Sequence, residues 1–110
     1  MQAMLEPTQN NTNLLIGFCV LIRRSALEKV GGVHPGLPGG DDFDLSIRFR
    51  KEGYRLVLDA SAFVFHHGCQ TGGRLHPTYW NTNEMIHDTR RALILKHSLA
   101  DYLSCTQFTP

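Results

Sequence analysis

Residues 39–53 of this chain read GGDDFDLSIRFRKEG, and the fold prediction starts from this stretch. Two glycines precede a group of three carboxylates, and the basic residues lie toward the other end. Acidic side chains at the start of a helix and basic ones at its end both complement the helix dipole. The apolar residues between them recur four positions apart, which places them on one face. The stretch therefore predicts a helix over residues 41–52 that Gly53 closes.

Apolar runs flank this helix on both sides. Residues 14–22 form a continuous apolar run rich in branched and aromatic side chains, which favours a strand buried on both faces. A helix is the alternative there, although Gly17 at its centre disfavours it. Two shorter strands are predicted over residues 54–58 and 62–66.

Two more helices and a loop complete the predicted elements. Ser25 begins a capping-box pattern, so it is the expected N-cap of a helix of about two turns. Residues 67–77 are polar and contain glycine, which indicates a flexible loop. A last helix is predicted from Asn81, with a glutamate three residues later. Its face has helical spacing and comprises Met85, Thr89, Ala92, Leu95, Leu99 and Leu103.

The order strand, helix, helix, strand, strand, helix indicates an α/β fold with a mixed sheet of about three strands flanked by helices. Residues 1–13 are polar and are expected to be a flexible N-terminal segment. Residues 14–110 are then a single α/β domain. Since so few helices cover a sheet only thinly, we expect this sheet to be part of a larger one.

Length and charge exclude several classes of protein. A chain of 110 residues that is 42% hydrophobic fits one domain. Its 11 basic and 10 acidic residues give a net charge of +1, which argues against a nucleic-acid-binding protein. No stretch approaches the ~20 apolar residues needed to span a bilayer, and the first residues do not resemble a signal peptide.

Three cysteines, Cys19, Cys69 and Cys105, are widely spaced and include no CxxC pair, which excludes a zinc ribbon. They are expected to be reduced thiols of a cytoplasmic protein. One disulfide plus one free thiol is the alternative.

Asp41 and Asp42 are the leading candidates for chemistry. One carboxylate of such a pair can act as a general base while its neighbour orients the acceptor. The alternative is structural, with Asp41 as an N-cap and the following carboxylates complementing the helix dipole.

His66 and His67 end a predicted strand, where a histidine can bind a metal or protonate a leaving group. Adjacent residues of a strand point to opposite faces, so only one of the two is expected to face a site. The alternative is a histidine hydrogen-bonded to the backbone.

Other polar features are weaker. Arg23 and Arg24 are interpreted as a solvated edge. Residues 71–74 read TGGR and could approach a phosphate, but they lack the P-loop pattern. The remaining histidines show no ligand-like pairing and receive no role, namely His34, His76, His87 and His97.

Residues 17–71 resemble the C-terminal half of the catalytic domain of family 2 glycosyltransferases, rhamnosyltransferase-like bacterial members above all. Four segments match in order: GFCVLIRRSAL at 17–27, EKVGG at 28–32, DDFDL at 41–45 with Arg48 and KEGY at 51–54, and AFVFHHG at 62–68. The resemblance implies a partial GT-A-like (Rossmann-like) fold. It also implies inverting transfer of a sugar from a nucleotide-sugar to a hydroxyl acceptor, a glycan or a lipid-linked molecule, in surface polysaccharide synthesis.

By the same resemblance Asp42 is the base, Asp41 binds the acceptor, and His66 contacts a metal or the diphosphate. A divalent ion, Mg or Mn, would stabilise the departing diphosphate in the full-length enzyme. Such an enzyme would work in the cytoplasm or at the cytoplasmic face of the membrane.

Two departures from the family pattern matter. The family has Glu-Asp where this chain has Asp41-Asp42, and no Asp-x-Asp metal motif lies upstream of Gly17. The chain is therefore expected to be a fragment, a truncated form or a degenerate relative of such an enzyme. We expect it to be inactive alone and to associate with itself through an open sheet edge. The alternatives are a non-catalytic binding or assembly module, and a small metal-binding protein using the histidines and Cys69.

Overall fold

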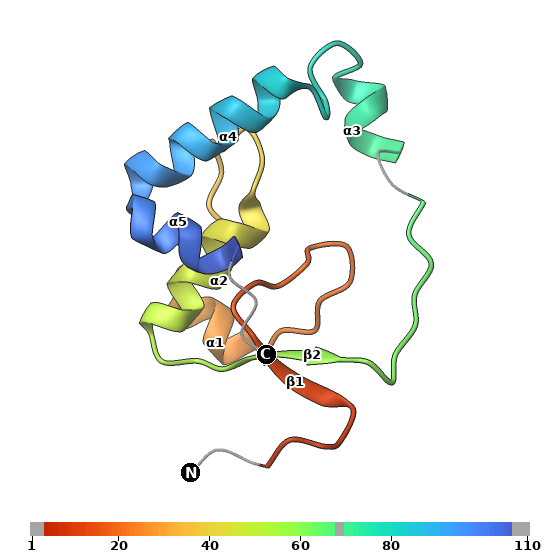
Figure 1. Cartoon of the computed structure of the whole chain (residues 1–110), viewed down its shortest axis with the longest axis vertical. Helices are drawn as coiled ribbons and strands as arrows, with labels where there is room; N and C mark the ends of the chain where they lie inside the picture. The colour runs from red at the N-terminus through yellow and green to blue at the C-terminus, as the bar shows by residue number, and fades with distance from the viewer. Residues whose placement is uncertain (1–3, 68–69, 107–110) are drawn as a thin grey trace.

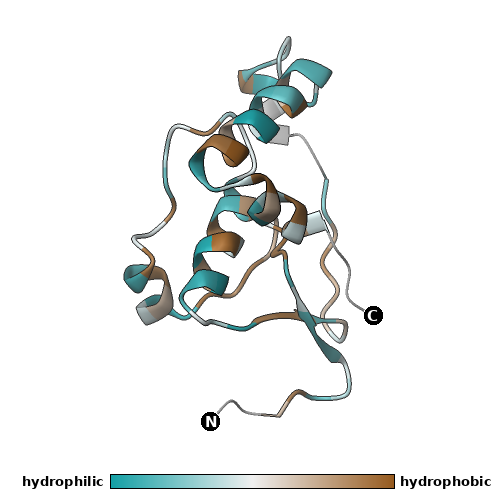
Figure 2. Ribbon diagram, turned by 60° about the vertical axis from the view of Figure 1, so that its left-hand side comes forward, coloured by the Kyte–Doolittle hydropathy of each residue, from teal (hydrophilic) through white to brown (hydrophobic). Residues whose placement is uncertain are grey.

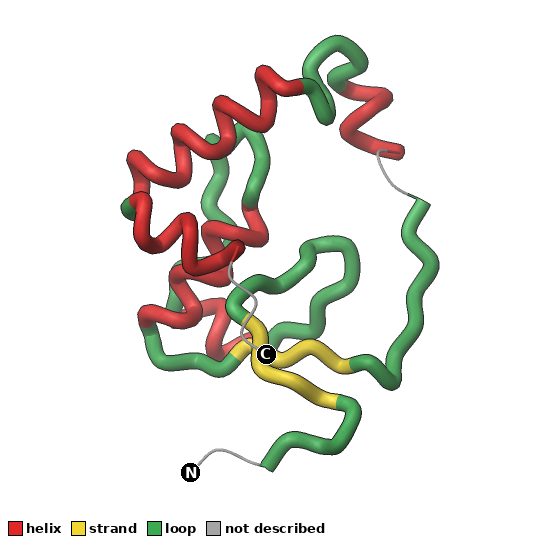
Figure 3. The backbone as a smooth tube through the Cα atoms, viewed as in Figure 1, coloured by secondary structure: helices red, strands yellow, loops and turns green. Residues whose placement is uncertain are grey.

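The computed structural model describes residues 4–67 and 70–106 and shows a mixed α/β chain (Figure 1). Helices α2, α4 and α5 lie together, while α3 stands apart beyond a long extended segment (Figures 1 and 3). The elements in order are β1 (Gln9–Thr12), α1 (Arg24–Lys29), α2 (Asp41–Lys51), β2 (Leu56–Asp59), α3 (Gln70–Leu75), α4 (Asn83–Lys96) and α5 (Leu99–Thr106).

Helix α2 confirms the prediction from the 39–53 stretch. It begins directly after Gly40 and ends one residue before the predicted end. Both flanking glycines adopt positive φ, 73° at Gly40 and 84° at Gly53, a region that costs glycine little. Its buried face includes Leu45, Ile47 and Phe49, as the four-residue spacing predicts.

The sheet has two strands among the described residues rather than about three. Strands β1 and β2 pair antiparallel, with Gln9 opposite Asp59 and Thr12 opposite Leu56. Residues 9–12 of the segment predicted to be flexible thus form a paired strand. Side-chain contacts add to the backbone pairing, since Gln9 Nε2 donates to Asp59 Oδ2 over 3.3 Å.

Residues 14–22 and 62–66 are loops, so both strand predictions there are wrong. A strand buried on both faces needs a pairing strand and a covering layer on each side, and the described chain supplies neither. Leu15 and Ile22 pack against the apolar core, but other apolar side chains of these loops face solvent. Leu21 is fully exposed, Phe63 is 91% exposed and Phe65 is 71% exposed. Brown segments in Figure 2 mark apolar residues within the loops.

Three helix predictions also change. The N-cap of α1 is Arg23 without a side-chain cap, so Ser25 lies inside the helix. Helix α4 is capped by Thr82, whose hydroxyl accepts from the Met85 N–H, and not by Asn81. Helix α4 ends at Lys96 and α5 begins at Leu99, so two helices form where a single last helix is predicted. The segment predicted as a loop contains α3.

A small apolar core joins α1, α2 and β2. It comprises Ala26, Leu45, Phe49 and Leu56. On the opposite side, the Phe43 ring stacks on Tyr102 with centroids 5.8 Å apart and so joins α2 to α5. Cys19 and Cys105 are free thiols, as expected; Cys69 lies outside the described residues. No helix in the described parts of the chain is long and apolar enough to cross a membrane.

Candidate functional site

Close packing against α4 places the first turn of α2. A Cβ atom on Gly39 would lie 2.8 Å from Met85 Cε, and one on Gly40 would lie 2.9 Å from Thr89 Cγ2. A side chain at Gly39 would displace the end of the Met85 side chain, and one at Gly40 would clash with Thr89 and Leu93 and strain a φ of 73°. The two glycines allow the backbone that leads to Asp41 and Asp42 to lie directly on this helix.

Asp42 is half-buried and faces the loop that follows residue 14. Its Oδ2 accepts the Gly17 N–H over 3.4 Å, and its Oδ1 accepts the Phe43 N–H over 3.0 Å. Each carboxylate oxygen has two lone pairs, so both can accept a further hydrogen bond. The site residue predicted as the base thus combines a fixed orientation with free accepting capacity.

Asp41 stands next to Asp42 and is exposed. Partial desolvation of its carboxyl group, followed by the negative charges of Asp42 and Asp44, raises the pKa of Asp41 above its ordinary value. An exposed carboxyl group of this kind is available to hydrogen-bond a polar ligand.

His66 and Asp42 both contact the loop turn at residues 17–18. Its ring stacks on Phe18 with centroids 4.6 Å apart and planes 10° apart, and Phe18 directly follows the Gly17 that holds Asp42. Asp42 contacts Gly17 and His66 contacts Phe18, so the two side chains lie against adjacent residues of one loop. His67 instead packs against the edge of the Phe65 ring.

A metal centre is not built by the described residues alone. No three His, Cys, Asp or Glu side chains in the described ranges are grouped so that they could hold a metal ion. A role of His66 as metal ligand therefore stays a prediction that requires ligands from outside these ranges. The same finding gives no support, within those ranges, to the metal-binding alternative.

Sequence reasoning missed a cluster around Asp44, whose side chain is 1% exposed. Lys96 Nζ lies 2.9 Å and His97 Nε2 2.6 Å from its Oδ1, and one Arg48 nitrogen lies 3.0 Å from its Oδ2. His34 Nδ1 is 4.0 Å from Oδ2 and 2.7 Å from Lys96 Nζ. Only the four-residue spacing of Asp44 and Arg48 was visible as a local signal.

Burial is the largest single influence on Asp44 and by itself would raise its pKa. Hydrogen bonds from Lys96, His97 and Arg48 outweigh burial and hold the pKa of Asp44 below its ordinary value. Arg48 also donates to the carbonyl oxygens of Val30 and Gly32, each over 2.7 Å. One ionised carboxylate therefore joins α2, the end of α4 and the segment after α1.

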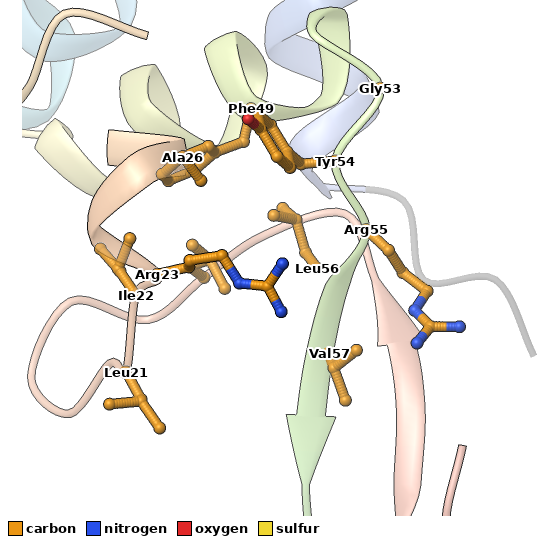
Figure 4. A pocket seen from close by; sticks show the side chains of 11 residues that line it. Leu21, Ile22, Arg23, Ala26, Phe49, Gly53, Tyr54, Arg55, Leu56 and Val57 are labelled. Atoms are coloured by element: carbon orange, nitrogen blue, oxygen red, sulfur yellow. The ribbon is translucent and has the colours of Figure 1, made fainter. Parts of the chain in front are cut away.

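A cavity of about 490 Å³ opens between β2 and the segment leading into α1 (Figure 4). Most of the residues that line it are apolar, and Arg23 and Arg55 are the charged members. Arg23 is exposed, as its interpretation as a solvated residue predicts. Asp41, Asp42 and His66 do not line this cavity. The candidate site therefore rests on the contacts of Asp42 with Gly17 and of His66 with Phe18.

Comparison with known proteins gives two curated relatives. Both are named N-acetylglucosaminyl-diphospho-decaprenol L-rhamnosyltransferase, from Mycobacterium tuberculosis strains CDC 1551 / Oshkosh and ATCC 25618 / H37Rv. Each is 39% identical over 74 residues, which is 66% of this chain and 24% of the relative. No protein-family model matches the chain. No solved structure shows a significant match.

These matches confirm the predicted resemblance to rhamnosyltransferase-like glycosyltransferases. The chain spans about a quarter of the length of the curated relatives it matches, 24% in each case.

Proposed function

We propose that this chain is the acceptor-side segment of a glycosyltransferase with a GT-A-like fold. The full-length enzyme would transfer a sugar, rhamnose in the first instance, from a nucleotide-sugar donor to a lipid-linked hydroxyl acceptor. The similarity over 74 residues to enzymes named as rhamnosyltransferases acting on a lipid-linked sugar carries this proposal. The placement of the exposed Asp41 beside the half-buried Asp42 at the start of α2 supports it.

In this proposal Asp42 is the general base. One of its oxygens takes the proton of the acceptor hydroxyl while the hydroxyl oxygen forms a bond to the anomeric carbon of the donor. The bond from that carbon to the diphosphate oxygen breaks, the electron pair leaves with the diphosphate, and the configuration inverts. The N–H groups of Gly17 and Phe43 fix the orientation of the base through this step.

Asp41 binds the acceptor beside the base. Its exposed carboxyl group can accept a hydrogen bond from a sugar hydroxyl that does not react. His66 is the proposed contact of this segment with a metal or with the diphosphate, and Mg or Mn would neutralise the charge of the leaving group when bound. The nucleotide-binding residues would lie outside this segment.

Polysaccharide assembly at the cytoplasmic face of the membrane is the proposed setting. A lipid-linked acceptor presents its sugar at the membrane surface, where the acceptor-side segment of the enzyme would meet it. This part of the proposal rests on the lipid-linked sugar named for the two relatives.

A transfer assay tests the proposed function. A full-length protein containing this segment is incubated with nucleotide-sugars labelled in the sugar and with a polyprenyl-diphosphate-linked N-acetylglucosamine. We expect labelled lipid with at least one donor. The 110-residue chain alone is expected to give no labelled lipid and no heat with the same donors in calorimetry.

Absence of transfer from every donor to the lipid-linked acceptor would contradict the proposal and favour a non-catalytic assembly module. A micromolar dissociation constant between the isolated chain and a nucleotide-sugar would contradict the placement of donor binding outside this segment.

We further propose that the isolated chain associates with itself through its sheet. The two-stranded sheet leaves backbone N–H and C=O groups on the outer edges of β1 and β2, and such edges pair readily with another strand. Sedimentation analysis is expected to show a concentration-dependent dimer. A single monomeric species over the whole concentration range would contradict an edge that pairs.

A further inference from the structure

We propose that Asp44 is a positioning residue, which couples the end of α4 to the first turn of α2 and thereby holds Asp42 in its orientation. Its importance for catalysis rests on the proposed function, whereas the coupling itself does not. Asp44 contacts neither donor nor acceptor in this proposal and acts through the backbone that carries Asp42.

The backbone of Asp44 bonds within the first turn of α2, whereas its side chain bonds to the end of α4. Its N–H donates to the Gly40 carbonyl oxygen over 3.0 Å and closes the turn in which Asp42 stands. Its carboxylate accepts from Lys96 and His97, the last residue of α4 and the one that follows it. Because the side chain is 1% exposed, water cannot readily replace these donors.

Helix α4 also touches the turn on the other side of Asp42. Gly40 lies where a Cβ atom would come within 3.0 Å of Leu93 Cδ1, and Gly39 packs closely on Met85. Apolar contacts thus fix the backbone before Asp42, and ionic contacts fix it after Asp42. The turn is held at both ends by one helix, so a shift of α4 is transmitted to the carboxylate between them.

The amide resonance of Gly17 can report the orientation of the Asp42 side chain. The Gly17 N–H lies 3.4 Å from Asp42 Oδ2 and belongs to a different segment of the chain. Amide proton shifts depend strongly on hydrogen-bond length, so the Gly17 resonance reports whether Asp42 has moved. An Asp42→Asn variant calibrates the size of this response.

The test compares amide spectra of the 110-residue chain in three variants. Asp44→Asn removes the shared negative charge, and Lys96→Gln removes one donor whose side chain is 31% exposed. Asp101→Asn is the matched control, because it breaks a 2.9 Å ion pair with Lys51 at the far end of α2.

We expect Asp44→Asn and Lys96→Gln to shift the Gly17 and Phe43 amide resonances, and Asp101→Asn to leave both in place. In Lys96→Gln, hydrogen exchange at the Asp44 amide should be at least tenfold faster. Unchanged Gly17 and Phe43 resonances in folded Asp44→Asn would overturn the proposal. If Asp44→Asn does not fold, the same unchanged resonances in Lys96→Gln overturn it.

These outcomes are separable from those of the proposed function, because they need no turnover. If the resonances shift but Asp42→Asn retains activity in the full-length enzyme, Asp44 positions the turn and Asp42 is not the base. If the resonances stay and Asp42→Asn is inactive, Asp42 keeps its role and the coupling is wrong.

Discussion

Replacement of Asp42 by asparagine in the full-length enzyme is expected to lower turnover about 10²–10⁴-fold, the usual effect of losing a general base. The amide matches the carboxylate in size and keeps one oxygen that can accept the Gly17 N–H or the Phe43 N–H. It cannot accept a proton from the acceptor hydroxyl at neutral pH. Because the position lies at a helix terminus outside the core, the melting temperature should change little.

Turnover, donor affinity and melting temperature of Asp42→Asn are measured together with Asp41→Asn. The Asp41 variant is the matched control, because it changes the neighbouring carboxylate and should mainly raise the KM for the acceptor. Turnover of Asp42→Asn within about threefold of the unmodified enzyme would show that Asp42 only completes the helix start. Unfolding of Asp42→Asn would show that the main role of Asp42 is to stabilise the fold.

Helix α2 could be predicted because every signal for it is local. The glycines at both ends, the acidic first turn and the spacing of the apolar residues all lie within residues 39–53. Each of these signals acts between residues of one helix turn or of adjacent turns. The same stretch also gave Asp41 and Asp42 as candidates, and the structure places them at the start of that helix.

Strand β2 (Leu56–Asp59) confirms in part the strand predicted over residues 54–58. The other two strand predictions failed for the opposite reason. Residues 14–22 have the composition of a buried strand, but a strand forms only where another strand accepts its backbone hydrogen bonds. Strand β1 reads QNNT, in which only Thr12 is a residue type enriched in strands and the two asparagines are depleted there, so no strand was indicated. It pairs with β2 nonetheless, across a separation of about fifty residues.

The Asp44 cluster could not be predicted from spacing either. His97 and Lys96 are more than fifty residues away from Asp44 in the sequence, and His34 lies in the loop before α2. They meet only because α4 packs back across the glycine turn. Histidines without ligand-like pairing in sequence therefore proved to be partners of a buried carboxylate.

The packing of α4 leads to the prediction with the largest expected effect on stability. Leu93→Ala should lower the free energy of unfolding by about 2–5 kcal/mol. Leu93 is 1% exposed and its Cδ1 faces the Gly40 backbone, so truncation leaves a cavity between α4 and the start of α2. Urea unfolding followed by circular dichroism measures the change.

Leu95→Ala on the same helix is the matched control, because helix spacing placed Leu95 on the buried face whereas the structure leaves it 78% exposed. Its effect should stay within about 0.5 kcal/mol, as for other surface substitutions. Both variants make the same chemical change and have the same helix propensity, so only burial separates them. Equal losses in the two variants, or a larger loss in Leu95→Ala, would mean that α4 presents a different face to α2. The packing of Gly39 and Gly40 on α4, which places Asp42, would then be refuted as well.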